Sequence, residues 1–434
     1  MYEIWVGNNR FVILSHPSLI DQIYVPNTKT KFFPRSEIKH FNGNGFLKNF
    51  THLTQSLFNE NESYWDKKKY QIDFAKWIKC FTTDITLQTV TCKPSYCLNT
   101  YLFGENHDDP IRSEEIKRTV YFTKAVQTFL TNVLFQMFIP EVLKNYFPGF
   151  YHLNKKYKKN SDWLTETMLD VISKRRKEID NMQSDEKIGS NLLDILLTLN
   201  TPRDPNGYDE SEPPLTDQEV CSTITEVSIA VSILIESFPI PSTDTTGNTF
   251  CFTVWLLVKH PKVIARFREE ISEILGEDIS RQITYEDLEK FTYLDAIIKE
   301  STRVLTLTPL TPRISTQESI IGGKHLEANT KFLILHELIH KLPEFWENPD
   351  DFIPERFLKE TNNEITKNAF IPFGGGTRIC PGRHMAMVEL KTLLILLFRK
   401  YDVELVDNVS KKPKTQFTAV YECTEMKVLV RPKY

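Results

Sequence analysis

A ten-residue segment near the end of the chain, FGGGTRICPG at 373–382, combines residue types suited to a soft metal centre. Its consecutive glycines allow the backbone to approach a flat ligand closely, and Arg378 supplies a fork of donors suited to a carboxylate. Cys380 stands at the predicted entry to a helix, where amide donors and the helix dipole favour thiolate over thiol. Pro381 fixes the turn. The segment therefore predicts a thiolate site beside an arginine and the aromatic ring of Phe373.

The same segment has the pattern F-x-x-G-x-R-x-C-x-G, and in this it resembles the haem-binding signature of the cytochrome P450 family, the haem-thiolate monooxygenases. The resemblance implies that Cys380 is the axial ligand to the iron of haem b. It also implies that Phe373 packs near the thiolate and that Arg378 pairs with a haem propionate. Gly376 and Gly382 complete the pattern. A structural buried cysteine in a glycine turn is the alternative interpretation.

Further motifs follow in the order in which that family has them. Glu300 and Arg303 lie three residues apart, on one face of a predicted helix where their charges can pair, and they resemble the family's E-x-x-R element. Arg356, in PERF, resembles the arginine that joins this pair, which implies a structural network of the three side chains. Arg313, in TPLTPRIS, matches the family's further propionate-binding arginine.

Two more matches concern the cofactor and oxygen activation. Trp65 resembles the tryptophan of the family's W-x-x-x-R element, with Lys69 in the place of the arginine. A lysine still donates to a propionate but lacks the bidentate fork. Asp244 and Thr245 resemble the acid–alcohol pair of the family's long central helix. The resemblance implies that the Thr245 hydroxyl orients the oxygen being activated and that Asp244 resupplies protons.

The stretch before Asp244 departs from the family pattern. SILIESFPIP ends on Pro239 and Pro241, two prolines inside one expected helix, and each costs roughly 3 kcal/mol or more in a helix interior. We interpret residues 228–241 as an in-frame insertion, for which an unspliced segment of the gene is one explanation. Two alternatives to a monooxygenase stay open: a haem-thiolate isomerase that rearranges peroxides and, because of the Pro239/Pro241 insertion, a non-catalytic haem binder or defective gene product.

A rival motif, HELIH at 336–340, matches H-E-x-x-H, in which two histidines on one helix face bind zinc and the glutamate is a general base. The preceding FLIL is typical of a strand, and Pro343 follows three residues after the second histidine, which leaves little room for a helix. A zinc protease is therefore the less favoured hypothesis.

The elements that must position these residues are predicted to be mainly helical. Apolar periodicity and capping signals predict helices over 110–146, from Thr216, after Pro261, over 285–305 and over 382–400. Residues 2–14 are predicted to form a β-hairpin, and further strands are expected near the C-terminus. The fold class is therefore mainly α with a small β region, and the resemblance implies the cytochrome P450 fold with a buried haem. We expect residues 1–434 to form a single domain without an N-terminal membrane anchor.

Composition excludes several classes of protein. The chain has 53 Lys and Arg against 57 Asp and Glu, a net charge of −4, so it has no overall basic field for nucleic acid. Its 7 cysteines are typical of scattered thiols in a reducing compartment rather than of a disulfide framework. The longest apolar run, 227–235, is too short to cross a bilayer.

The resemblance implies an enzyme that inserts one oxygen atom of O2 into a small apolar substrate, with electrons from NADPH through a flavoprotein reductase. TYEDLEKFTYLDAIIKESTR and PERF resemble eukaryotic members of the family, and a fungal origin is one hypothesis. Such members lie on the cytosolic face of the endoplasmic reticulum membrane. We therefore expect that location, and contact with a membrane surface, for an N-terminally truncated member.

Overall fold

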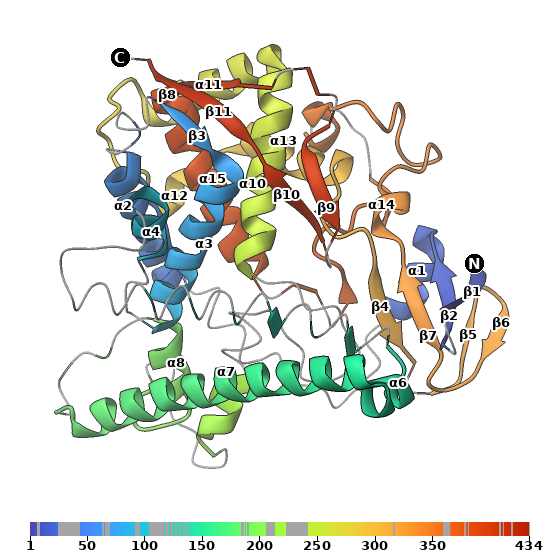
Figure 1. Cartoon of the computed structure of the whole chain (residues 1–434). Coiled ribbons are helices and arrows are strands. Elements are labelled where there is room, and N and C mark those ends of the chain that lie inside the picture. Colours follow the sequence, from blue (N-terminus) through green and yellow to red (C-terminus); the bar gives the residue numbers. More distant parts are fainter. Residues whose placement is uncertain are drawn as a thin grey trace.

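A central helix, α10 (Ser242–Lys259), organises the larger part of the protein, which is drawn in Figure 1 as a computed structural model. The other helices are α1 (Pro17–Tyr24), α2 (Asn44–Glu62), α3 (Phe74–Thr91), α4 (Cys97–Phe103), α6 (Glu141–Tyr146), α7 (Pro148–Asn181), α8 (Leu192–Thr198), α11 (Pro261–Leu275), α12 (Tyr285–Leu288), α13 (Thr292–Val304), α14 (His336–Ile339), α15 (Arg383–Lys400) and the 3-10 helix η3 (Pro354–Phe357). Helices α3, α13 and α15 pack against α10 and surround it.

The structure describes the whole chain apart from short segments and three longer ones. The residues outside the description are 7–8, 25–43, 63–64, 66–69, 92–95, 104–116, 118–120, 122–124, 126–127, 130–131, 133–134, 137–138, 184–185, 187, 189–190, 205–212, 223–241, 316, 359–364, 377–378, 381, 408, 411, 418–419 and 434, together with the side chains of 6, 9, 44, 90, 91, 103 and 242–244. The interpretation of residues 228–241 as an insertion falls on these residues, and so do the expected positions of Lys69, Arg378 and the Asp244 side chain.

The strands form small sheets at the edge of the helical body. They are β1 (Tyr2–Val6), β2 (Asn9–Leu14), β3 (Gln71–Asp73), β4 (Thr311–Ile314), β5 (Ser319–Ile321), β6 (Lys324–Leu326), β7 (Lys331–Ile334), β8 (Tyr401–Leu405), β9 (Lys414–Phe417), β10 (Tyr421–Glu425) and β11 (Lys427–Pro432). One sheet has the order β1-β2-β7-β4, another β3-β11-β8, and two hairpins join β9 to β10 and β5 to β6. In the first sheet β2 runs parallel to β7, so the N-terminal hairpin pairs with a strand more than three hundred residues later in the chain.

The predicted N-terminal hairpin is confirmed, with Tyr2 opposite Ile13 in antiparallel β1 and β2. The mainly helical fold class with a small β region is confirmed as well. The helix predicted over 285–305 is divided into α12 and α13, because the chain leaves the helical conformation between Leu288 and Thr292. A capping box of Thr284 and Asp287 begins α12. The apolar periodicity of the sequence continues through both helices and therefore predicted a single helix.

The core lies where α15 passes behind α10. Every residue from Val388 to Phe398 except Lys391 is buried, as expected for a helix whose apolar residues go all the way round it. On its far side α10 meets α3 at Gly247. A Cβ added there would lie 3.3 Å from a side-chain carbon of Ile78, so the missing side chain lets the two helices approach closely.

Helix α7 is a separate feature, 34 residues long, that crosses the lower side of the molecule in Figure 1. Its buried residues form one stripe at helical spacing, and Met168, Ile172 and Ile179 pack with α8 in a second, smaller core. Arg175 of α7 makes a bidentate ion pair with the buried Asp194 of α8, at 2.7 and 2.8 Å. In the part of the chain that the structure describes, no helix is both long enough and apolar enough to span a membrane.

Glu389 of α15 is a titratable group inside this core. Its side chain is 5 % exposed, and its Oε1 has no hydrogen-bond partner among the described residues. Burial raises the pKa of Glu389 to about 8, so the carboxyl is protonated at neutral pH.

We expect Glu389→Gln to stabilise the protein at high pH. The folded protein holds the Glu389 proton more tightly than the unfolded chain does. The free energy of unfolding of the original protein therefore falls as pH rises, by about 1.4 kcal/mol per pH unit between about pH 4.5 and pH 8. Urea unfolding should therefore show that the free energy of unfolding of the variant, relative to that of the original protein, increases by about 3 kcal/mol between pH 5 and pH 7.5. Glu404→Gln, at an exposed carboxylate paired with Arg431, is the control and should show no such gain. Equal pH slopes for Glu389→Gln and the original protein would refute the assignment.

Candidate active site

The loop that carries Cys380 turns back on itself just before α15. Gly374 and Gly376 adopt positive φ values of 70° and 63°, which glycine accepts at low cost. The Cys380 amide donates to the Phe373 carbonyl at 2.9 Å, and the Ile379 amide donates to Gly376 at 3.3 Å. Phe373, Gly376 and Cys380 are thereby held in one tight loop, with the Cys380 side chain exposed.

The position of Cys380 relative to α15 favours its ionised form. Gly382 is the N-terminal cap of this 18-residue helix, and Cys380 lies two residues before the cap. Amide groups at a helix N-terminus carry partial positive charge, which stabilises a thiolate nearby. The loop therefore presents an exposed sulfur close to the N-terminus of α15, at the point where a soft metal would be bound.

The neighbouring Tyr24 explains why the turn needs glycine at positions 375 and 376. A Cβ added to Gly375 would lie 2.5 Å from Cε2 of Tyr24, and one added to Gly376 would lie 2.9 Å from the Tyr24 carbonyl oxygen. The end of α1 therefore packs directly on the glycine turn. Arg313 of β4 belongs to the same region, because its guanidinium carbon lies 5.9 Å from the centre of the Tyr24 ring. The structure thus brings Arg313 and the Cys380 loop together around one tyrosine.

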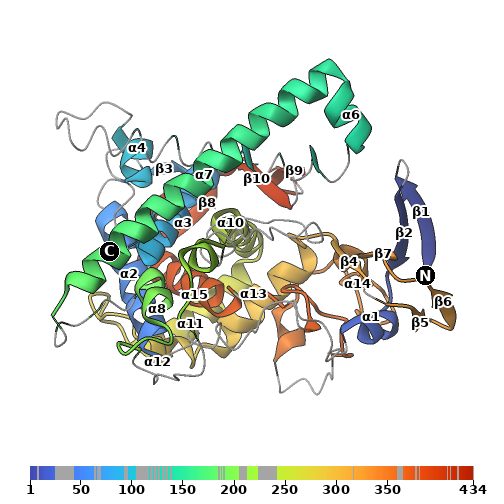
Figure 2. The same cartoon turned by 90° about the horizontal axis from the view of Figure 1, so that it is seen from below.

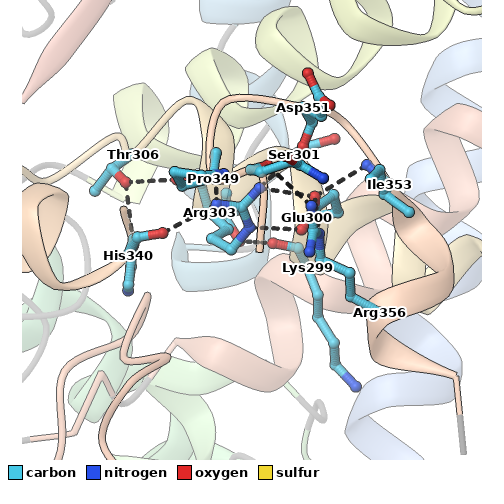
Figure 3. Close-up of polar contacts among 12 residues, drawn as sticks. Lys299, Glu300, Ser301, Arg303, Thr306, His340, Pro349, Asp351, Ile353 and Arg356 are labelled. Atoms are coloured by element: carbon cyan, nitrogen blue, oxygen red, sulfur yellow. Dashed lines mark hydrogen bonds and ion pairs between the residues drawn. The ribbon is translucent and has the colours of Figure 1, made fainter. Parts of the chain in front are cut away.

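The three charged residues expected to form a network do come together, at the end of α13 (Figure 3). Glu300 and Arg303 are fully buried and form a bidentate pair, with Nε to Oε2 at 2.7 Å and Nη2 to Oε1 at 2.8 Å. Arg356 of η3 donates from Nε to Glu300 Oε1 at 3.3 Å, and the Ile353 amide donates to the same oxygen at 3.0 Å. The Glu300 carboxylate therefore joins α13 to η3.

Arg303 satisfies the rest of its donors with main-chain carbonyls. Nη1 donates to His340 at 3.0 Å and to Pro349 at 2.6 Å, and Nη2 donates to Asp351 at 3.0 Å. All five N–H groups of the guanidinium are then used. The guanidinium also lies over the Trp346 ring, at 5.0 Å from its centre. This side chain therefore fixes the chain from 340 to 351 against α13.

The histidines of the H-E-x-x-H motif belong to this structural layer and not to a metal site. His340 Nε2 accepts from the Ile371 amide at 3.0 Å, so Nδ1 carries the proton and donates to Thr306 at 3.0 Å. His336 Nε2 lies 2.9 Å from the Thr311 hydroxyl. Burial lowers the pKa of His336 to about 3, so its ring is neutral at physiological pH.

The helix that the zinc hypothesis requires is a single turn of 4 residues, α14, which ends before His340. Glu337 accepts a hydrogen bond from Tyr421, at 3.2 Å. No group of three or more His, Cys, Asp or Glu side chains within the described residues could hold a metal ion. The motif is a coincidence of spacing in which both rings serve packing and hydrogen bonding.

We expect the purified protein to contain no stoichiometric zinc. Elemental analysis before and after treatment with a chelator should give the same low zinc content and the same unfolding temperature. His340→Ala should destabilise the protein by about 1–3 kcal/mol, because the buried Ile371 amide loses its acceptor, without changing the zinc content. One zinc per chain that His336→Ala removes would restore the metal hypothesis.

The residues expected to activate oxygen lie in the first turns of α10. The helix begins at Ser242, directly after Pro241, and the backbone of Asp244 is helical. Thr245 is half-buried, and its carbonyl accepts from the Thr249 hydroxyl at 2.8 Å. The pair is therefore on a regular helix, and a bond between its side chains is outside the description.

The structure does not place Trp65 near Cys380. Its ring is fully buried among aromatic residues, 5.5 Å from Phe58, 5.7 Å from Trp77 and 5.1 Å from Tyr401 between ring centres. Tyr401 directly follows α15, whereas Cys380 precedes it, and 18 residues of helix span about 27 Å. The expectation that Trp65 reaches a haem propionate is therefore not supported, and this tryptophan is a core residue.

No sequence pattern predicted Tyr24 as a residue of the site. Its contact with the glycine turn joins residues 24 and 375, and no local pattern marks a tyrosine at the end of a short helix as a neighbour of a loop so far along the chain. The same holds for Thr306, which links His340 to the carbonyl of Arg303 at 3.0 Å. Only the tertiary structure supplies these contacts.

Known proteins resemble this chain in sequence over much of its length. A family model described as Cytochrome P450 matches residues 45–429. Cytochrome P450 4d8 of Drosophila melanogaster is 30% identical over 276 residues, which cover 58% of this chain and 55% of that protein. Cytochrome P450 4V2 of Mus musculus is 33% identical over 170 residues, 39% of this chain and 32% of that protein. The chain thus spans about half the length, or less, of these curated relatives.

Solved structures give the same architecture. The haem domain of cytochrome P450DA superposes with a TM-score of 0.75 at 19% identity, covering 100% of this chain and 90% of that domain. A further cytochrome P450, CYP102L1, has a TM-score of 0.77 at 18% identity, with 100% and 95% covered. At these identities the likeness shows the fold.

Proposed function

Because the chain belongs to the cytochrome P450 family, we propose that it is a haem-thiolate monooxygenase that inserts one oxygen atom of O2 into an apolar organic substrate. The observation that supports this most directly is the Cys380 loop. An exposed sulfur precedes the N-terminus of α15 on a turn closed by the Cys380–Phe373 hydrogen bond. The substrate, the electron donor and the membrane location are parts of the same proposal.

The residues present fit the haem that the family carries. Cys380 would supply the thiolate ligand, and the positive φ values of Gly374 and Gly376 shape the tight loop that presents it. Arg313, held beside the turn, supplies the cationic partner for a propionate. Bound haem supplies the iron at which O2 is activated. A damaged gene product is less well supported, since the helices and the loop that hold this site are formed in spite of the prolines before α10.

In this proposal α10 supplies the proton route. The hydroxyl of Thr245 donates a proton or hydrogen bond at Oγ1 toward the reacting oxygen, and the carboxylate of Asp244 resupplies it. Thr245 is half-buried, which suits a group that must meet both a substrate cavity and solvent-derived protons. Thr249 holds the main chain of Thr245 through the 2.8 Å bond and steadies this turn.

For the electron source we propose NADPH acting through a flavoprotein reductase. This part of the proposal rests on family membership, and the similar proteins from Drosophila melanogaster and Mus musculus are eukaryotic members. The basic stretch at 174–176 is a poor choice for the surface that the reductase contacts, because its three cations are paired within the chain. The pairs are Lys174 with Asp170, Arg175 with Asp194 and Arg176 with Asp217.

For the location we propose the surface of the endoplasmic reticulum membrane, with α6 and the start of α7 as the contact. This segment lies at one end of α7, beyond the helical body (Figure 2). Its exposed apolar side chains are Val142, Leu143, Tyr146, Phe147 and Tyr151, and Lys155, Lys156, Lys158 and Lys159 are exposed beside them. Apolar residues flanked by lysines favour a bilayer interface with anionic lipid.

Flotation with vesicles tests the location. The protein should bind vesicles that contain phosphatidylserine, and the double variant Tyr146→Ser, Phe147→Ser should bind less. Equal flotation of the two proteins would contradict α6 as the contact.

The reduced, carbon monoxide-bound difference spectrum tests the central proposal, followed by turnover with NADPH and a reductase. A thiolate-type Soret band together with O2-dependent product supports a monooxygenase. The band with reductase-independent conversion of an organic peroxide would instead assign an isomerase. The band without any turnover would assign a non-catalytic haem binder, and absence of the band would overturn the haem site itself.

A further inference from the structure

The hydroxyl of Tyr24 is buried without a hydrogen-bond partner among the described residues. A buried hydroxyl without a partner is unfavourable, and native structures seldom retain one. Tyr24 is the last residue of α1, and its ring packs with the apolar cluster of β2, β7 and α1. Among the described residues, therefore, this oxygen has no acceptor, and a bound group could supply one.

The place of this hydroxyl is set by the glycine turn. The Cδ2 and Cε2 edge of the Tyr24 ring lies 2.6 and 2.5 Å from where a Gly375 Cβ would stand, and Cζ, which carries the hydroxyl, lies 3.3 Å from it. Gly375 is five residues before Cys380. The Tyr24 ring, which carries the hydroxyl, thus packs against the same loop that presents the sulfur.

The charge next to the ring indicates what the acceptor is. The Arg313 guanidinium lies 5.9 Å from the ring centre, so positive charge and a phenol O–H occur together. Burial raises the pKa of Tyr24 despite the opposing effect of Arg313, so the hydroxyl keeps its proton and acts as a donor. A donor beside a guanidinium is complementary to an anion, and a carboxylate is the anion that haem offers at its edge.

We propose that Tyr24 Oη donates a hydrogen bond to the haem propionate that Arg313 binds, and so positions the cofactor. The inference rests on the proposed haem-thiolate function. It also gives the site a propionate donor besides Arg313 and the expected Arg378, in a chain whose Trp65 lies at the other end of α15.

Tyr24→Phe removes only the hydroxyl and keeps the ring against Gly375. We expect haem to leave the purified holoprotein about tenfold faster when excess apomyoglobin captures it, the effect of one lost hydrogen bond to a charged group. Tyr401→Phe is the matched control, because that hydroxyl bonds Glu62 at 2.9 Å at the opposite end of α15, and its haem loss should be unchanged.

Haem dimethyl ester, in which both propionates are neutral esters, separates hydrogen bonding from packing. With the ester, Tyr24→Phe and the original protein should release the cofactor at nearly equal rates. Equal rates with haem itself would overturn the inference, and so would a difference that persists with the ester. Failure of the original protein to bind haem at all would instead refute the proposed function.

Discussion

Cys380→Ala is expected to abolish the thiolate-type Soret band and to reduce the proposed monooxygenase turnover to the level of free haem. The sulfur is the side-chain atom that the loop presents next to the N-terminus of α15, and alanine has no ligand to replace it. The amide of residue 380 still donates to Phe373 in the variant, so the loop should keep its shape. Far-ultraviolet circular dichroism should therefore match the original protein while the reduced carbon monoxide spectrum loses the band.

Cys80→Ser is the control for that substitution. Cys80 lies in α3 and is partly buried, so the variant changes a thiol that no proposal assigns to the cofactor. Its band and turnover should be retained. A thiolate band that survives in Cys380→Ala would mean that another cysteine holds the iron, and that the family signature misidentifies the ligand in this chain.

Arg303→Ala is expected to destabilise the protein by about 3–5 kcal/mol, the cost of breaking a buried ion pair. The substitution leaves the fully buried Glu300 carboxylate without its bidentate partner and the carbonyls of His340, Pro349 and Asp351 without a donor. Native proteins have only about 5–15 kcal/mol of stability in total. We therefore expect little soluble holoprotein, and a large fall in the urea midpoint for the fraction that folds.

Arg431→Ala is the matched control, since it also breaks an arginine–carboxylate pair. Its partner Glu404 is 3.1 Å away, but the two side chains are 59% and 55% exposed, and such a pair contributes about 1 kcal/mol or less. Similar losses for the two variants would show that the Glu300–Arg303 pair is not the structural centre described above. Arg303→Lys should fall between them, because a lysine keeps the charge but loses the fork.

Parts of the fold and site depend on neighbours close in sequence, and these were predictable. The β1–β2 hairpin, the start of α15 near Gly382 and the i,i+3 pair of Glu300 and Arg303 each involve a few consecutive residues. Local spacing therefore determines them. The mainly helical fold class follows in the same way from apolar periodicity, and it is confirmed.

Trp65 and His336 show where such prediction failed or needed context. A tryptophan four residues before a lysine matched a cofactor motif, yet Trp65 packs against Tyr401, a contact across more than three hundred residues. His336 and Glu337 satisfied a zinc pattern, yet Thr311 and Tyr421, from other elements, hydrogen-bond to them. In each case a long-range contact decided the role of the residue.

The sequence by itself determined the ligand candidate Cys380, the glycine turn, the Glu300–Arg303 pair and the fold class, because each depends on residue type and spacing over a few positions. The tertiary structure alone decided that Tyr24 lies on the turn at Gly375 and that Trp65 belongs to the core, and it supplied the 3.3 Å contact through which Arg356 joins Glu300. Those contacts join residues far apart in the chain, and the packing of whole helices and strands brings them together.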